Sequence, residues 1–233
     1  MAACVLTAVQ DKGVAMNLLA MPVYSPTFAP ADNDTAAMAA ALMQARQTIL
    51  PKRLLVPGPD PGELDMLLNA AATAPDHGQL LPWRFVRVPQ AARARLADVF
   101  GTALLERDAA ATADQVAQAR EKAHRAPLLL LLIVNGLRGD ADIDLFERIV
   151  SAGCAVQNML LMATALGYGS ALTSGKALKS ARLRTLFDLA QGEHALCFVS
   201  IGTVQSRKSA RLRPAPSDFL STLSPDHSVV AGA

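Results

Sequence analysis

The run Leu128–Val134 (LLLLLIV) constrains the fold more than any other part of the chain. Seven consecutive apolar residues are far fewer than the roughly 20 that cross a bilayer, but they suit a strand that is buried on both faces. Such a strand lies in the interior of a sheet, and both faces of that sheet must be covered by other elements. The sequence therefore predicts a sheet packed between helices.

A long apolar helix is predicted at about residues 142–166, closed by Gly167 as a helix-terminating residue. Its stretch IVSAGCAVQNMLLMATAL is apolar nearly all round. A helix of this kind must be buried on several sides. The sheet of its own chain can bury one side of this helix, and a second subunit is a candidate for covering another.

The remaining patterns predict helices and strands that alternate along the chain. Asp60, Pro61 and Glu63 form the expected start of one helix, with Asp60 as the N-cap and Glu63 as its capping-box partner. Strands separated by helices indicate an α/β or α+β sandwich with one mixed sheet. No GxGxxG follows a strand and no Walker loop occurs, so a Rossmann unit is not supported. The other expected helices are 35–47, 91–106, 109–124 and 177–187, and the other expected extended segments are 84–88, 169–174 and 195–204.

The domain organisation follows from composition. Residues 1–37 are expected to be a loosely attached N-terminal extension, residues 38–216 one domain, and residues 217–233 a C-terminal tail. There is no basic start followed by an apolar core, which argues against a signal peptide.

The overall charge gives little reason to expect a charged macromolecular partner. With 22 basic and 20 acidic residues, the net charge of +2 is too small to favour nucleic acid or an anionic membrane as a partner. Three widely spaced cysteines in apolar context are expected to be buried free thiols of a cytoplasmic protein, and no CxxC or HExxH points to a metal.

Three short stretches could carry chemistry. Arg46-Gln47-Thr48, at the end of the first predicted helix, offers a guanidinium and a hydroxyl suited to a phosphate or a polyol, or it is a solvated helix end. In APDHGQLLPWRF (residues 74–85), His77 either points at a ligand from a rigid turn or is exposed beside Asp76. Trp83 of the same stretch is expected to be core.

The third stretch, LGYGSALTSG (residues 166–175), places hydroxyls beside glycines that allow a flat ligand to approach the backbone. The glycines also fit a helix cap followed by a sheet-edge bulge. No Ser/His/Asp set or pair of carboxylates emerges, so an enzymatic reaction would have to be carried by a bound cofactor. The basic tail forms an anion site or a solvated segment; its cations are Arg207, Lys208, Arg211 and Arg213.

Taken together and in this order, these stretches resemble the nitroreductase family of FMN-dependent flavoproteins, in particular its short single-domain bacterial members. The resemblance covers about residues 40–216. It rests on Arg46-Gln47-Thr48, APDHGQLLPWRF, RAPLLLLLIV (125–134), Ser151–Gly175 and FVSIGTV (198–204).

The resemblance implies an α+β three-layer sandwich, with a mixed, largely antiparallel sheet flanked by helices and the long buried helix at a dimer interface. It implies a homodimer with two FMN sites, each built from both chains. Arg46, Gln47 and Thr48 would hold the phosphate and ribityl chain, and Leu172, Thr173 and Ser174 would line the isoalloxazine. Residues 162–167 would adjoin the nicotinamide. Thr73, Pro75 and His77 would reach the flavin of the partner subunit.

Two departures from the family pattern concern charge. Many relatives carry a second Arg soon after the first, a role that Lys52, Arg53, Arg211 or Arg213 could fill here. Many relatives also hold Trp-Arg where this chain has Leu172-Thr173.

The implied activity is ping-pong hydride transfer from NAD(P)H through flavin N5 to a nitroaromatic, quinone or similar small acceptor, with no side chain required as acid or base. The alternative is a flavin-binding protein without that turnover: a flavin store, a sensor or a flavin-consuming enzyme.

Overall fold

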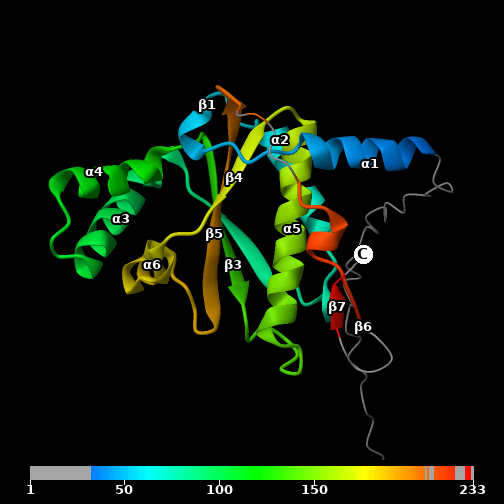
Figure 1. Ribbon diagram of the computed structural model, residues 1–233. Coiled ribbons are helices and arrows are strands. Elements are labelled where there is room, and N and C mark those ends of the chain that lie inside the picture. The colour runs from blue at the N-terminus through cyan, green and yellow to red at the C-terminus, as the bar shows by residue number, and fades with distance from the viewer. Residues whose placement is uncertain (1–32, 208, 210–212, 224–228, 232–233) are drawn as a thin grey trace, which may run out of the picture.

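A computed structural model describes residues 33–207, 209, 213–223 and 229–231. Its centre is a five-stranded sheet with the order β1-β5-β3-β2, and β4 pairs with β5 beside β1 (Figure 1). Every pairing between these strands is antiparallel. Within the described residues, the parallel contact is a single bridge between Thr48 and Ser170, so the expected mixed sheet is almost wholly antiparallel. The strands are β1 (Leu54–Leu55), β2 (Trp83–Arg87), β3 (Leu128–Asn135), β4 (Gly169–Thr173) and β5 (Glu193–Val204).

The apolar run forms β3, in the interior of the sheet as predicted. Residues 128–134 are all buried, and they alternate between two cores because successive side chains of a strand point to opposite faces. Leu128, Leu130, Leu132 and Val134 belong to the core with α2 (Pro61–Ala72) and α5 (Leu145–Ala165). Leu129, Leu131 and Ile133 belong to the core on the other face.

Helix α2 begins where the sequence predicts, and α5 begins at Leu145, three residues after the predicted start at 142. Asp60 accepts a hydrogen bond from the backbone N–H of Glu63, and the Glu63 side chain accepts one from the Asp60 N–H, which completes the predicted capping box of α2. Asp144 caps α5, and Gly167 follows it at φ 84°, where a side chain would be strained.

The opposite face carries α3 (Arg93–Arg107), α4 (Ala113–Glu121) and α6 (Ala181–Leu186), which completes three layers (Figure 1). The prediction of one helix at 177–187 is wrong. A 3-10 turn at Lys176–Lys179 stops at Ser180, whose hydroxyl accepts from the Leu183 N–H and starts α6 anew. Likewise α4 ends at Glu121 and gives way to a 3-10 turn at Lys122–His124.

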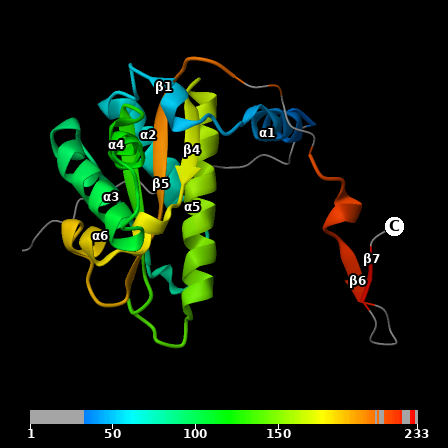
Figure 2. The same cartoon turned by 60° about the vertical axis from the view of Figure 1, so that its left-hand side comes forward.

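Helix α1 (Asn33–Ala45) and the C-terminal hairpin of β6 (Ser221–Leu223) and β7 (Val229–Ala231) extend from the body on the side of α5 (Figures 1 and 2). The first helix was predicted at 35–47, but it ends two residues earlier because the chain then turns to pair with β4. Residues 1–32 lie outside the described residues, so the boundaries at 37 and 216 stay predictions.

The cysteines only partly match the expectation of buried thiols. Cys154 and Cys197 are free and half-buried, and Cys4 lies outside the described residues. Burial raises the pKa of the Cys197 thiol to about 11, which makes it a poor nucleophile. In the part of the chain that the structure describes, no helix combines the length and apolarity needed to cross a membrane.

Candidate functional site

The segment after α1 lies directly against β4 and brings two of the predicted stretches together. Thr48 bridges Ser170, and the Ile49 N–H donates to the Ser170 carbonyl at 2.9 Å. Gly169 permits this approach, since an added Cβ would lie 2.9 Å from Ile49 Cγ1. Arg46-Gln47-Thr48 therefore flanks the strand that leads to Leu172-Thr173-Ser174.

One edge of β4 remains open beyond this bridge. The Ser170 carbonyl points to Ile49, and peptide groups two residues apart on a strand point to the same side. The N–H and C=O of Leu172 therefore face the same outer edge, where neither β1 nor β5 pairs with them. This edge offers backbone donors and acceptors to a ligand, as the contacts of a flat heterocycle require.

The Ser170 side chain supplies a second sign of an incomplete site. Its hydroxyl is buried and has no hydrogen-bond partner among the described residues. Buried polar groups are normally paired, so an unsatisfied one needs an explanation such as an absent ligand, ion or water. The segment that pairs with Ser170 fits a flavin phosphate and ribityl chain, because it carries a guanidinium at Arg46 and a hydroxyl at Thr48 and lies beside the open backbone edge of β4.

One of the two tail arginines predicted to bind the phosphate, Arg213, reaches this region. Arg213 Nη2 donates to the Arg46 carbonyl at 3.1 Å, which brings its charge next to the predicted phosphate site. Arg211 lies outside the described residues.

Thr73, Pro75 and His77 lie elsewhere, on the face of the molecule covered by α5, and all three are exposed. Asn158 Nδ2 of α5 donates to Thr73 Oγ1 at 3.0 Å, and His77 Nδ1 lies 2.8 Å from Glu147 Oε2. Within one chain, Arg46–Thr48 therefore lies beside the strand that leads to Leu172–Ser174. Thr73, Pro75 and His77 are not part of this arrangement.

The rest of the APDHGQLLPWRF stretch is a structural joint. Asp76 Oδ2 accepts from the Leu81 N–H at 2.6 Å, the local turn contact that the sequence offered as one alternative. Trp83 is buried in the core as predicted, and its Nε1 donates to Ser151 Oγ at 3.0 Å.

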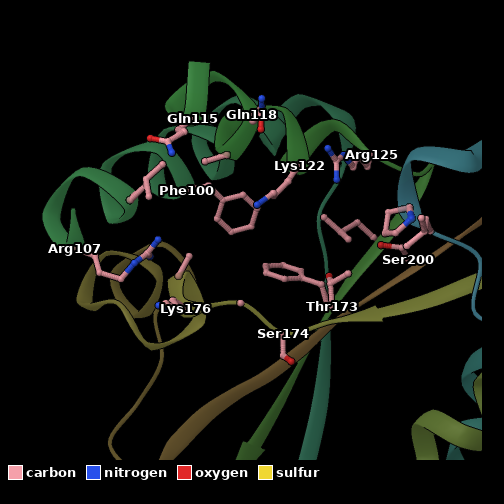
Figure 3. A pocket seen from close by; sticks show the side chains of 18 of the residues that line it. Phe100, Arg107, Gln115, Gln118, Lys122, Arg125, Thr173, Ser174, Lys176 and Ser200 are labelled. Carbon is pink, nitrogen blue, oxygen red and sulfur yellow. The ribbon is translucent and has the colours of Figure 1, made fainter. Parts of the chain in front are cut away.

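A cavity of about 720 Å³ opens on the opposite face of the sheet, between β4, α3 and α4 (Figure 3). Thr173 and Ser174 line it, as do Leu50 and Pro51 from the segment after α1. The cavity therefore adjoins both stretches that the structure brings together.

The walls that α3 and α4 contribute were not foreseen from the sequence. Helix α4 has no buried residue of its own among Ala113–Glu121, and it packs on α3 instead of the sheet. The sequence of α4, ADQVAQARE, begins with a capping box but has no apolar stripe. This pattern was the one available signal that α4 covers a cavity and does not contribute to a core.

The pKa shifts of Tyr168 and Glu193 come from contacts that involve neither Arg46–Thr48 nor Leu172–Ser174. A bidentate hydrogen bond from Arg84 lowers the pKa of Glu193 at the far end of β5, and a hydrogen bond to Glu63 raises the pKa of Tyr168. Within the described residues, no group of three or more His, Cys, Asp or Glu side chains could hold a metal ion.

The fold and the paired stretches define a class of protein. Residues 54–203, more than half of the chain, match the family described as Nitroreductase family. The chain belongs to the nitroreductase family, and its α+β sandwich is the fold of that family. Membership supports an oxidoreductase of the flavin type.

Particular proteins resemble this chain in sequence or in fold. "Putative NAD(P)H nitroreductase YdjA" of Escherichia coli K12 is 32% identical over 172 residues, which cover 72% of this chain and 91% of the relative. The crystal structure of a nitroreductase-like family protein from Bacillus cereus superimposes with a TM-score of 0.67 at 18% identity, over 78% of this chain and 93% of that one. An FMN-dependent nitroreductase from Clostridium difficile gives a TM-score of 0.55 at 20% identity, over 74% and 91%.

Proposed function

We propose that the protein is an FMN-dependent oxidoreductase that passes hydride equivalents from NAD(P)H to a small acceptor such as a nitroaromatic or a quinone, in the cytoplasm. The observation that carries the proposal is the contact between Thr48 and Ser170, which joins Arg46-Gln47-Thr48 to the open edge of β4. NAD(P)H loses a hydride and becomes NAD(P)⁺, while a quinone takes up two electrons and two protons. A nitro group that takes up the same equivalents becomes a nitroso group and releases one water.

The residues around the open edge would bind FMN. Arg46 offers the flavin phosphate a charge-assisted hydrogen bond, Arg213 adds a second positive charge beside it, and Thr48 suits the ribityl hydroxyls. Leu172, Thr173 and Ser174 would line the isoalloxazine. When bound, FMN supplies the hydride chemistry, and the protein contributes hydrogen bonds, shape and the exclusion of water.

We further propose that two copies of the chain form a homodimer through α5. Phe146, Val150, Gly153 and Gln157 follow helical spacing and form an exposed stripe on this helix, with Phe146 77% and Val150 64% accessible. Gly153 has nothing within 4 Å of the position of a Cβ, so no contact inside the chain explains a glycine in mid-helix. Close approach of a partner helix would explain it.

Other exposed apolar side chains support the same interface. Met38 of α1 and Phe219 and Leu223 near the C-terminus are all at least 70% accessible. Helix α1 and the C-terminal hairpin extend on the side of α5 (Figure 2). Covering such apolar surface is a normal reason for subunits to associate. In this dimer Thr73, Pro75 and His77 would contact the flavin of the partner subunit.

The deciding experiment is anaerobic mixing of the purified, FMN-loaded protein with NADPH and, separately, with NADH. Loss of the flavin absorbance, followed by its recovery when a quinone is added, is the expected result. If the protein binds FMN but NAD(P)H does not bleach the flavin, it would be the alternative: a flavin store, a sensor or a flavin-consuming enzyme. The uncharged Thr173, at a position where many relatives carry Arg, is the residue that favours this alternative. Failure to bind FMN would reject both readings.

A further inference from the structure

The cavity between the sheet and the α3–α4 pair has an apolar floor. Phe100, Leu104, Leu129 and Phe198 contribute to its lining. The rings of Phe100 and Phe198 meet edge to face, with their centroids 5.7 Å apart. A floor of this kind suits a flat, apolar or aromatic body.

The rim of the same cavity is cationic. Arg107 of α3, Lys122 and Arg125 after α4 and Lys176 after β4 line it, and Figure 3 shows them on different walls. Asp108 is the one carboxylate in the lining.

Most of these cations are not neutralised inside the chain. Arg107, Lys122 and Lys176 have no ion-pair partner among the described residues, whereas Arg125 is bridged to Glu121. Several positive side chains around a cavity with apolar walls attract and hold an anionic ligand. The chain as a whole carries a net charge of only +2, so this is a local feature and not a consequence of composition.

The position of the cavity connects it to the proposed chemistry. Thr173 and Ser174, the residues that would line the flavin, also line the cavity. A ligand in the cavity would therefore lie beside the cofactor.

We propose that this cavity selects the electron acceptor, and that the acceptor is a planar aromatic compound bearing a carboxylate or another anionic group. The inference rests on the proposed function. Its aromatic body would lie on the Phe100–Phe198 floor, and its anionic group would meet Lys122 and Arg107.

The test is equilibrium binding to the full-length, FMN-loaded protein in the absence of NAD(P)H, measured by titration calorimetry. The probes are 4-nitrobenzoate and 4-nitrobenzamide, which share their shape and differ in charge. We expect the anion to bind at least about fivefold more tightly, as one or two exposed ion pairs allow, and added salt to reduce the difference.

Two variants and a matched control locate the effect. Lys122→Gln and Arg107→Gln should each remove most of the preference for the anion and leave binding of the amide within about twofold. Lys179→Gln removes the same charge from an exposed residue outside the cavity and should keep the preference. Unchanged FMN content and circular dichroism would show that the variants fold.

Several results would overturn the proposal. Equal affinity for the two probes would do so, as would an equal loss in Lys179→Gln. Release of FMN by 4-nitrobenzoate would mean that the cavity belongs to the flavin. A Lys122→Gln protein that discriminates between NADPH and NADH differently, with the probes unaffected, would assign the cations to the 2′-phosphate of the dinucleotide. Because the titration needs no turnover, its failure is separate from a failure of NAD(P)H to bleach the flavin.

Discussion

At the scale of single residues, Arg46 is the side chain on which FMN affinity should depend most. Arg46→Ala would remove the proposed charge-assisted hydrogen bond to the phosphate, so we expect a loss of about 1.5–3 kcal/mol, or roughly ten- to a hundredfold in Kd. Quenching of flavin fluorescence during titration of the apoprotein measures it. Arg95→Ala, at an exposed position of α3 away from the cavity, is the control. An unchanged Kd for Arg46→Ala would remove Arg46 from the site.

Glu193 should make stability depend on pH. Arg84 Nε and Nη2 donate to its two carboxylate oxygens at 2.7 and 2.9 Å, and these hydrogen bonds hold the pKa of Glu193 below its ordinary value. Because the folded pKa is the lower one, the pair stabilises the protein above the pKa of the unfolded chain. That stability is lost as the pH falls through the folded pKa.

Glu193→Gln tests this pH dependence. The variant should lose about 2 kcal/mol of unfolding free energy at neutral pH and approach the parent protein in acid. Urea denaturation over a pH series gives the difference. Glu106→Gln breaks a half-exposed pair with Arg182 and should cost less than about 1 kcal/mol. A Glu193→Gln difference that stays constant with pH would contradict the assignment.

At the scale of elements, the capping box of α2 fixes where that helix begins. Asp60→Ala leaves the Glu63 N–H without its acceptor and should cost about 1 kcal/mol of stability. Thermal unfolding of the variant measures the loss. Asp65→Ala, at an exposed position within α2, should stay within about 0.5 kcal/mol of the parent. Equal effects of the two changes would mean that the box does not set the helix start.

The elements also show how far sequence reasoning reaches. Strand β3 and the start of α2 were predictable because an apolar run and an N-cap signal act within a few residues. The break at Ser180 was missed because a serine inside a helical pattern can either continue the helix or cap a new one. The choice depends on how residues 176–186 pack against the second core, which local sequence does not contain.

The candidate site likewise has one part that could be predicted from the sequence and another that could not. The stretches around Arg46 and Thr173 were identifiable, but their proximity depends on the pairing of Thr48 with Ser170, which is a long-range contact. The cationic cavity was not foreseen, because Arg107, Lys122 and Lys176 come from separate elements and share no motif. Only the folded chain brings their charges around one hollow.

At the scale of the whole molecule, the proposed dimer would bring together the two groups of residues predicted to bind the flavin. The chain places Arg46–Thr48 near β4 and Thr73–His77 on the α5 face, so a shared site requires that the second group come from another copy. The exposed stripe of α5 would bring the copies together.

Disrupting that stripe should therefore affect assembly and flavin binding in the same variant. Val150→Arg places a charge in the middle of the proposed interface, where burial of an unpaired charge is strongly unfavourable. We expect a monomer in sedimentation equilibrium and an FMN affinity at least about tenfold weaker, because Thr73 and His77 of the second copy are lost. Leu105→Arg, at an exposed apolar position on α3, is the control and should leave both properties unchanged. A Val150→Arg protein that is monomeric and binds FMN normally would show that one chain completes the site, while one that remains dimeric would place the interface elsewhere.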